Sequence, residues 1–223
     1  MTNEQKESLK FYTINDYLLI NGLLWNENEK TIDEIIQIIN SDGQAVMKEA
    51  IEMGYDVRWN CSKEKGEEIF KIYQKRFPVI DCETVKEQII ARAYQDINNM
   101  MDCLTPLDKD MVLYRNIKQR FVEDLKEGVV FKCLGFSSCS IYPHFAENAM
   151  YGSSNCLLFE IEVPKNIPVI RMDLMKDIQN EEDEIILAPM QFVVTKIDNI
   201  QQKVYMKYDK ALEMDDIYAN RNC

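Results

Sequence analysis

The sequence is poor in glycine and histidine, and its glycines form none of the patterns that bind phosphate. Only seven glycines occur in 223 residues, and none belongs to a G-x-G or G-x-x-x-x-G-K pattern. A glycine-rich loop that holds a nucleotide by its phosphates is therefore excluded. His144 is the one histidine, so histidine-rich zinc sites are excluded as well, and a histidine-based catalytic triad would have to use that residue.

Long apolar runs and cysteine pairs are also missing. No segment approaches the ~20 apolar residues that cross a bilayer, and the N-terminal residues lack the hydrophobic region of a signal peptide. The seven cysteines are scattered and include no C-x-x-C pair, which is typical of reduced thiols in a reducing compartment. We therefore expect a protein that acts in a cytosol, either its own or that of a host cell reached by secretion without a signal peptide.

Acidic residues outnumber basic ones. The chain has 38 Asp and Glu against 26 Lys and Arg, which gives a formal net charge of −12. Nucleic acids and anionic membranes attract proteins through Lys and Arg, so this charge argues against either as a partner. Hydrophobic residues make up 46% of the chain and are spread along it, so the sequence can bury a substantial core.

The order of the predicted elements indicates an α+β fold. Capping-box patterns at Thr31–Glu34 and Thr84–Glu87, each followed by apolar residues at helical spacing, predict helices over 31–39 and 84–101, with a third over 62–73. Later runs rich in β-branched and aromatic residues predict strands over 111–115, 129–133, 156–163, 168–171, 184–188, 191–197 and 203–209. Helices followed by strands argue against alternating βαβ units. We expect one domain over 1–223, with a helical part over 1–105, a β-rich catalytic part over 106–212 and a tail over 213–223.

Three short segments of the β-rich part carry polar residues where strands usually carry apolar ones. They are Val112-Leu-Tyr-Arg115, Gly135-Phe-Ser-Ser-Cys-Ser140, and Glu181-Glu-Asp-Glu184 leading into an aliphatic run. Each has an ordinary structural explanation: a strand-end arginine that reaches solvent, a turn or strand edge, and a solvated loop. These explanations are favoured for each segment taken alone.

Taken together, the segments hold the groups that cleave a glycosidic bond. An arginine guanidinium can grip a diphosphate through two hydrogen bonds. Ser138 and Ser140 alternate onto one strand face, where their hydroxyls can bond a carboxylate or a ribose. Glu182 and Glu184 also share a face, and paired carboxylates can stabilise an oxocarbenium-like transition state and move a proton.

In this order, the three segments resemble the arginine, serine and glutamate signature of the ADP-ribosyltransferases related to bacterial binary and exoenzyme-type toxins. That family has an aromatic-Arg strand, a G-F-x-S-T-S strand, and E-x-E or Q-x-E followed by aliphatic residues and a proline. The matching residues here are Leu113–Arg115, Gly135–Ser140 and Glu182–Pro189. Two supporting matches, Tyr12–Leu24 and Phe159–Lys165, extend the resemblance over about residues 10 to 210. It implies a mixed or antiparallel β core of two sheets.

The resemblance also implies an activity: a toxin-like or effector-like mono-ADP-ribosyltransferase that moves ADP-ribose from NAD to a protein and releases nicotinamide. NAD is then a substrate, and no metal is implied. Arginine is the implied acceptor, because Glu182 stands where asparagine-modifying relatives have glutamine. The implied partners are a protein substrate and an antitoxin or inhibitor protein. Two alternatives stay open: an NAD glycohydrolase on the same fold, and a catalytically inactive binding module.

The resemblance assigns roles to individual residues. Glu184 stabilises the sugar cation, Glu182 orients and deprotonates the acceptor, and Ser138 holds Glu184 and the ribose region. The residues assigned to NAD binding are Arg115, Tyr114, Asn116, Ser138, Ser140, Phe145 and Tyr151. Phe145 and Tyr151 are candidates for stacking on nicotinamide, because the aligned position holds Ala149.

Two other residues invite a catalytic interpretation that the sequence does not favour. Cys139 replaces the family's middle threonine, and no cationic surroundings that would form a thiolate can be read from the sequence. His144 is expected to be a surface or supporting side chain, because no serine or cysteine in a nucleophile-elbow context accompanies it.

Overall fold

The computed structural model describes most of the β-rich part and three helices that precede it. The described residues are 1–13, 17–24, 55–56, 61–62, 84–119, 122, 124–148, 156–174 and 184–213. The chain divides into two compact units, one made of Met1–Lys6 with Met100–Cys223 and the other of Glu7–Asn99. Two predicted helices, 31–39 and 63–73, lie outside the described residues. Ser62, predicted as the start of the second, pairs instead with Tyr55 in a two-stranded sheet of β1 (Tyr55–Asp56) and β2 (Cys61–Ser62).

Three helices are described in the N-terminal part of the chain: α1 (Asn3–Phe11), α2 (Tyr17–Leu24) and α5 (Thr84–Met101). Helix α5 begins at Thr84, as the capping-box pattern predicts. Helix α1 begins with a capping box of its own, in which the backbone N–H of Thr2 donates to Gln5 Oε1 at 2.7 Å and the N–H of Gln5 donates to Thr2 Oγ1 at 3.2 Å.

A buried carboxylate on α5 organises the second unit. Asp96 is 0% exposed and accepts a hydrogen bond of 2.7 Å from the Ser8 hydroxyl of α1. Asn99 Nδ2 in turn donates to Ser8 Oγ at 2.9 Å. Because a buried polar group is costly unless it is hydrogen-bonded, this network specifies how α1 pairs with α5.

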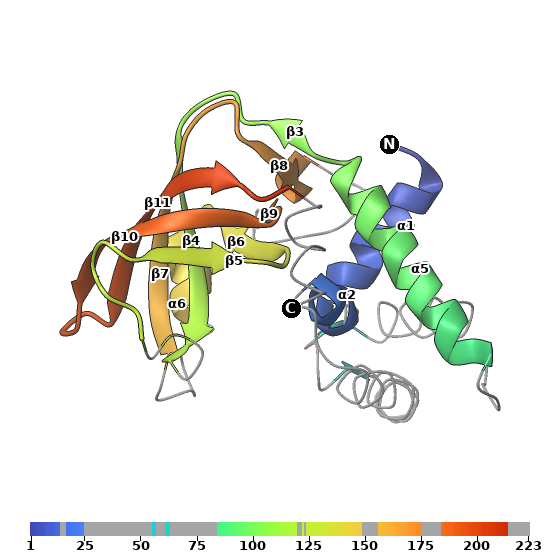
Figure 1. Cartoon of the computed structure of the whole chain (residues 1–223), viewed down its shortest axis with the longest axis horizontal. Helices are drawn as coiled ribbons and strands as arrows, with labels where there is room; N and C mark the ends of the chain where they lie inside the picture. Colours follow the sequence, from blue (N-terminus) through green and yellow to red (C-terminus); the bar gives the residue numbers. More distant parts are fainter. Residues whose placement is uncertain are drawn as a thin grey trace. The chain divides into compact units, whose positions relative to one another are not determined.

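The β-rich unit is a nine-stranded sheet with a short helix on it (Figure 1). The strands are β3 (Thr105–Pro106), β4 (Met111–Lys118), β5 (Val130–Cys133), β6 (Ser137–Ser140), β7 (Cys156–Val163), β8 (Pro168–Arg171), β9 (Glu184–Leu187), β10 (Met190–Asp198) and β11 (Lys203–Ala211). Their order is β3-β8-β9-β6-β4-β7-β11-β10-β5, and every pair is antiparallel except β7 with β11. All seven predicted strands are present, and the α+β class is confirmed.

The sheet has a narrow junction at its centre. Strands β4 and β6 are joined by one residue pair, Tyr114 with Ser140. On one side of the junction lie β3, β8, β9 and β6, and on the other lie β4, β7, β11, β10 and β5. The prediction of two sheets in the β core is therefore corrected: the junction joins the two groups into one continuous nine-stranded sheet.

Alternation along the strands builds the core of this unit. In β4, Leu113 is 0% exposed while its neighbour Val112 is 39% exposed. Strand β9 is buried on both faces, and Ile185, Ile186 and Leu187 are each 0% exposed. Phe136, Phe159 and Phe192 are the largest fully buried side chains among the described residues. Among the helices described, none is both long and apolar enough to span a bilayer.

Candidate active site

Tyr114, Ser138, Ser140 and Glu184 lie on one face of the sheet at its junction. Glu184 of β9 lies directly opposite Ser140 of β6, and Ser140 lies directly opposite Tyr114 of β4. Directly opposed residues have Cβ atoms about 4.5–5.5 Å apart, so the three side chains leave one face of the sheet as neighbours. Ser138 pairs with Ile186 two positions further along, on the same face. The structure thus brings both serines and Glu184 together, with Ser140 directly across from the carboxylate.

Glu184 is a buried carboxylate at the start of a strand. Its side chain is 8% exposed, and the three residues that follow are fully buried. Glu184 therefore does not lie in a solvated loop. Keeping an ionised carboxylate out of water costs free energy, and such groups cluster at functional sites. Glu182 and Tyr151, the other predicted residues of this region, lie outside the described residues.

Arg115 lies inside a strand, which corrects its expected position at a strand end. Strand β4 continues to Lys118, because Asn116, Ile117 and Lys118 keep pairing with β7. Arg115 is half-buried and shares a face of β4 with the buried Leu113. Its Nη1 donates to the backbone carbonyl of Ser138 at 3.4 Å. The guanidinium is thus held against the serine strand. By strand alternation, the half-buried Tyr114 and Asn116 lie on the other face of β4.

The charges of both Arg115 and Glu184 act on the Cys139 thiol. Burial raises the pKa of Cys139 to about 12; Arg115 lowers this pKa, while Cys133 and Glu184 raise it. A thiol that stays protonated is a poor nucleophile, which argues against Cys139 as a catalytic residue.

The raised pKa predicts that Cys139 resists alkylation in the native protein. At pH 8 a thiol with a pKa of about 12 holds roughly a thousandfold less thiolate than a cysteine at its ordinary pKa. We expect iodoacetamide to label Cys139 slowly in the folded chain and quickly in denaturant, as peptide mass spectrometry can measure. Equal rates in the two states would contradict the burial of this thiol.

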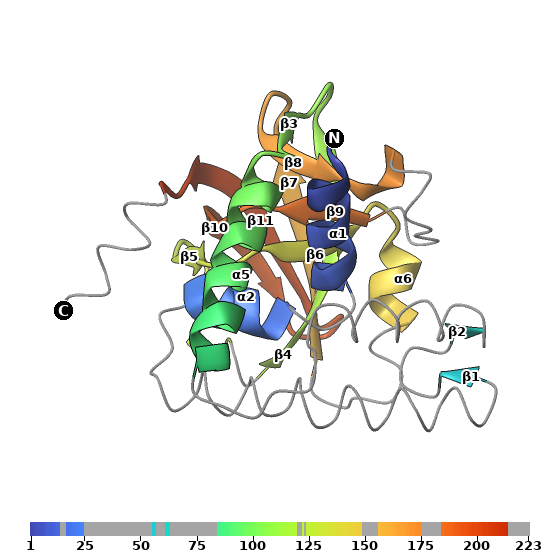
Figure 2. The ribbon, with the colours of Figure 1, turned by 90° about the vertical axis from the view of Figure 1, so that its right-hand side faces the viewer.

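A cluster of rings follows the serine strand. Ser140 Oγ accepts a hydrogen bond of 3.0 Å from the backbone N–H of Tyr142, and helix α6 (Pro143–Asn148) then packs on β4 and β6 (Figure 2). The ring centroids of His144 and Phe145 are 4.3 Å apart, and that of Tyr142 lies 5.6 Å from His144 and 6.3 Å from Phe145. Phe145, a predicted nicotinamide contact, is half-buried, and His144 is exposed. Three rings within four residues are the sequence signal for this cluster. The signal is missed when each ring is considered alone.

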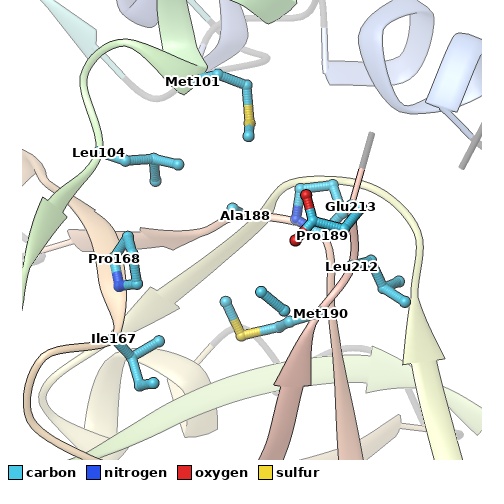
Figure 3. A pocket seen from close by; sticks show the side chains of 10 residues that line it. Met101, Leu104, Ile167, Pro168, Ala188, Pro189, Met190, Leu212 and Glu213 are labelled. Carbon is cyan, nitrogen blue, oxygen red and sulfur yellow. The ribbon is translucent and has the colours of Figure 1, made fainter. Parts of the chain in front are cut away.

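A separate apolar pocket lies at the other end of β9, beyond Ala188 and Pro189. Its volume is about 310 Å³, and Figure 3 shows side chains from several segments around it. The lining residues are Met101, Leu104, Ile167, Pro168, Ala188, Pro189, Met190, Ala211, Leu212 and Glu213. None of the predicted site residues lines this pocket, and its one carboxylate is exposed. This pocket is therefore distinct from the predicted site.

Three solved structures are similar to this chain, and the first, with a TM-score above 0.5, supports the fold. Vis, an ADP-ribosyltransferase toxin from Vibrio splendidus whose structure is solved in complex with agmatine, is 17% identical, with 95% of this chain and 75% of that chain covered and a TM-score of 0.52. The catalytic domain of VahC from Aeromonas hydrophila is 10% identical, with 94% and 100% covered and a TM-score of 0.49. The C3 exoenzyme from Clostridium limosum is 11% identical, with 95% and 86% covered and a TM-score of 0.44.

Comparison of sequences gives the family. No curated protein sequence matches this chain. The family model described as ADP-ribosyltransferase exoenzyme, in contrast, matches residues 1–213, nearly the whole chain. The chain therefore belongs to the ADP-ribosyltransferase exoenzyme family.

Proposed function

We propose that the chain moves ADP-ribose from NAD to an arginine side chain of a protein and releases nicotinamide. Membership of the family makes it an NAD-dependent ADP-ribosyltransferase of the toxin type; the acceptor and the roles of individual residues are the proposal. The observation that supports it most is the buried Glu184, directly opposite Ser140 on the strand whose Ser138 carbonyl accepts a hydrogen bond from Arg115.

The NAD half of the reaction uses charges of both signs. Arg115 binds the diphosphate and offsets the repulsion that a protein with a net charge of −12 exerts on it. Glu184 accepts a hydrogen bond from the ribose and stabilises the oxocarbenium that forms as nicotinamide leaves. Ser138 and Ser140 fix the carboxylate and the ribose from the neighbouring strand, with Tyr114 and Asn116 beside them on β4. Phe145 or Tyr151 stacks on nicotinamide.

The acceptor half needs a second carboxylate. A guanidinium has a pKa above ~12, so it must be bound and must lose a proton as it attacks the sugar. Glu182 would do both. Agmatine carries a guanidinium group, and its presence in the solved complex with Vis supports a guanidinium acceptor for this chain as well.

Labelled NAD separates this function from its alternatives. The purified chain is incubated with NAD labelled in the adenine moiety, and either agmatine or a cell lysate is added. We expect label on agmatine and on protein arginines, identified by mass spectrometry. Release of free ADP-ribose alone would identify an NAD glycohydrolase, and no consumption of NAD would identify an inactive binding module.

Replacing Arg115 with lysine is expected to weaken NAD binding more than it slows the reaction. Lysine keeps the positive charge but cannot donate two parallel hydrogen bonds to the diphosphate. Losing one charge-assisted hydrogen bond predicts a KM for NAD about tenfold higher, with kcat changed less. Steady-state kinetics of NAD hydrolysis measures both constants.

Arg171→Lys is the matched control for this change. Arg171 of β8 is also partly buried, with 18% of its side chain exposed, and pairs with Asp108 at 3.7 Å. Its replacement should leave the KM for NAD unchanged. An unchanged KM in Arg115→Lys would count against contact between Arg115 and the diphosphate.

A further inference from the structure

Two rings of the cluster after β6 remain open to solvent. Tyr142 is 43% exposed and His144 is exposed, while Phe145 lies half-buried beside them. The rings of Tyr142 and His144 are tilted by 33° with centroids 5.6 Å apart, and that of Phe145 is 4.3 Å from His144. Phe145 thus supports two outer rings whose remaining surface is free to receive another group.

The outer rings begin beside Glu184. The Ser140 hydroxyl, on the face of the sheet that carries Glu184, holds the backbone N–H of Tyr142 at 3.0 Å. Since Ser140 and Glu184 are directly opposed, the backbone of Tyr142 is held at a residue that neighbours the carboxylate.

Exposed aromatic rings beside a carboxylate favour the binding of a cation. The face of an aromatic ring attracts a cation, most effectively the flat guanidinium group, which also stacks on it. Glu184, directly opposite Ser140, puts a buried carboxylate on the same face of the sheet, so ring faces and a negative charge lie near one another. An anionic or neutral side chain would gain nothing from this combination.

We propose that Tyr142 and His144 form a platform that holds the acceptor guanidinium by cation–π contact while it is aligned with the sugar. The proposal rests on the proposed arginine acceptor and names the residues that select it. Phe145 supports the platform and keeps its proposed contact with nicotinamide, so the outer rings serve the acceptor and not NAD.

The test uses agmatine as a small guanidinium acceptor and measures its KM in ring variants of the full chain. Tyr142→Leu should raise the KM for agmatine about fivefold, and the double variant Tyr142→Leu with His144→Leu about twentyfold, in line with cation–π contacts. Tyr142→Phe keeps a ring and should stay close to wild type. NAD hydrolysis without acceptor should be unchanged in all of them, which also shows that they fold.

Tyr205→Leu is the matched control. Tyr205 of β11 is half-buried and already has a cation, Lys196 Nζ, 5.2 Å from its ring centroid. Its loss should not change the KM for agmatine.

The outcomes separate this inference from the proposed function. An unchanged KM for agmatine in the double variant overturns the platform and leaves arginine transfer standing. Parallel loss of NAD hydrolysis assigns the rings to the NAD site or to folding and also overturns the platform. If wild type labels neither agmatine nor protein arginine, the proposed acceptor fails, and the platform fails with it.

Discussion

Glu184→Gln is expected to reduce NAD cleavage more than a hundredfold, with and without an acceptor. Glutamine keeps the shape of the side chain, which matters at a position only 8% exposed, but removes the negative charge that faces the sugar cation in the proposed mechanism. Loss of one preorganised electrostatic contact of this kind costs about 3–4 kcal/mol in the transition state. At about 1.4 kcal/mol for each factor of ten, a loss of ~3 kcal/mol already exceeds a hundredfold.

The measurement is single-turnover cleavage of NAD, with binding followed separately. Binding of NAD should change little, because Glu184 acts on charge that develops only in the transition state. Glu160→Gln is the control, since Glu160 is a half-buried carboxylate on β7, opposite Tyr114. Turnover above about a tenth of wild type in Glu184→Gln would exclude the charge-stabilising role.

Most strands could be predicted because the pattern of apolar, β-branched and turn residues that forms them lies within each segment of the sequence. Strand β7 has the predicted bounds, Cys156–Val163, since its apolar residues alternate and turn residues precede and follow it. Strand β6 was harder, because Ser137–Ser140 is a run of small polar residues that usually forms a turn or an edge. It is a central strand only because β9 and β4 pair with it on its two sides. Non-local pairing overrides local propensity here, and only the family resemblance indicated a strand.

The site was predictable as a set of residue types and not as a geometry. The resemblance selected Arg115, Ser138 and Glu184, but their arrangement depends on contacts between distant residues. The bond from Arg115 to the Ser138 carbonyl spans 23 positions and needs β4 to extend past the arginine. The burial of Glu184 likewise comes from its neighbours in the sheet. The acidic stretch of sequence around it predicted exposure to solvent.

Glu182→Gln is expected to separate transfer from NAD cleavage. If Glu182 deprotonates the acceptor, its loss removes general-base catalysis, which contributes about 10²–10⁴-fold. ADP-ribosylation of agmatine and of protein arginine should therefore fall more than a hundredfold. Slow hydrolysis of NAD should survive, because Glu184 still stabilises the sugar cation and water needs less activation than a guanidinium once that cation has formed.

The two products, ADP-ribosyl-agmatine and free ADP-ribose, are quantified in the same reaction, so the change is read as a ratio that does not depend on enzyme concentration. Glu181→Gln is the control, because strand alternation predicts the opposite face for this neighbouring acid. Equal loss of both products would assign Glu182, with Glu184, to NAD cleavage. Retention of both would mean that Glu182 is a solvated loop residue with no part in the reaction. The arginine assignment is tested by the wild-type chain alone: modified asparagine, serine or nucleic-acid bases in place of arginine would contradict it, whatever Glu182→Gln does.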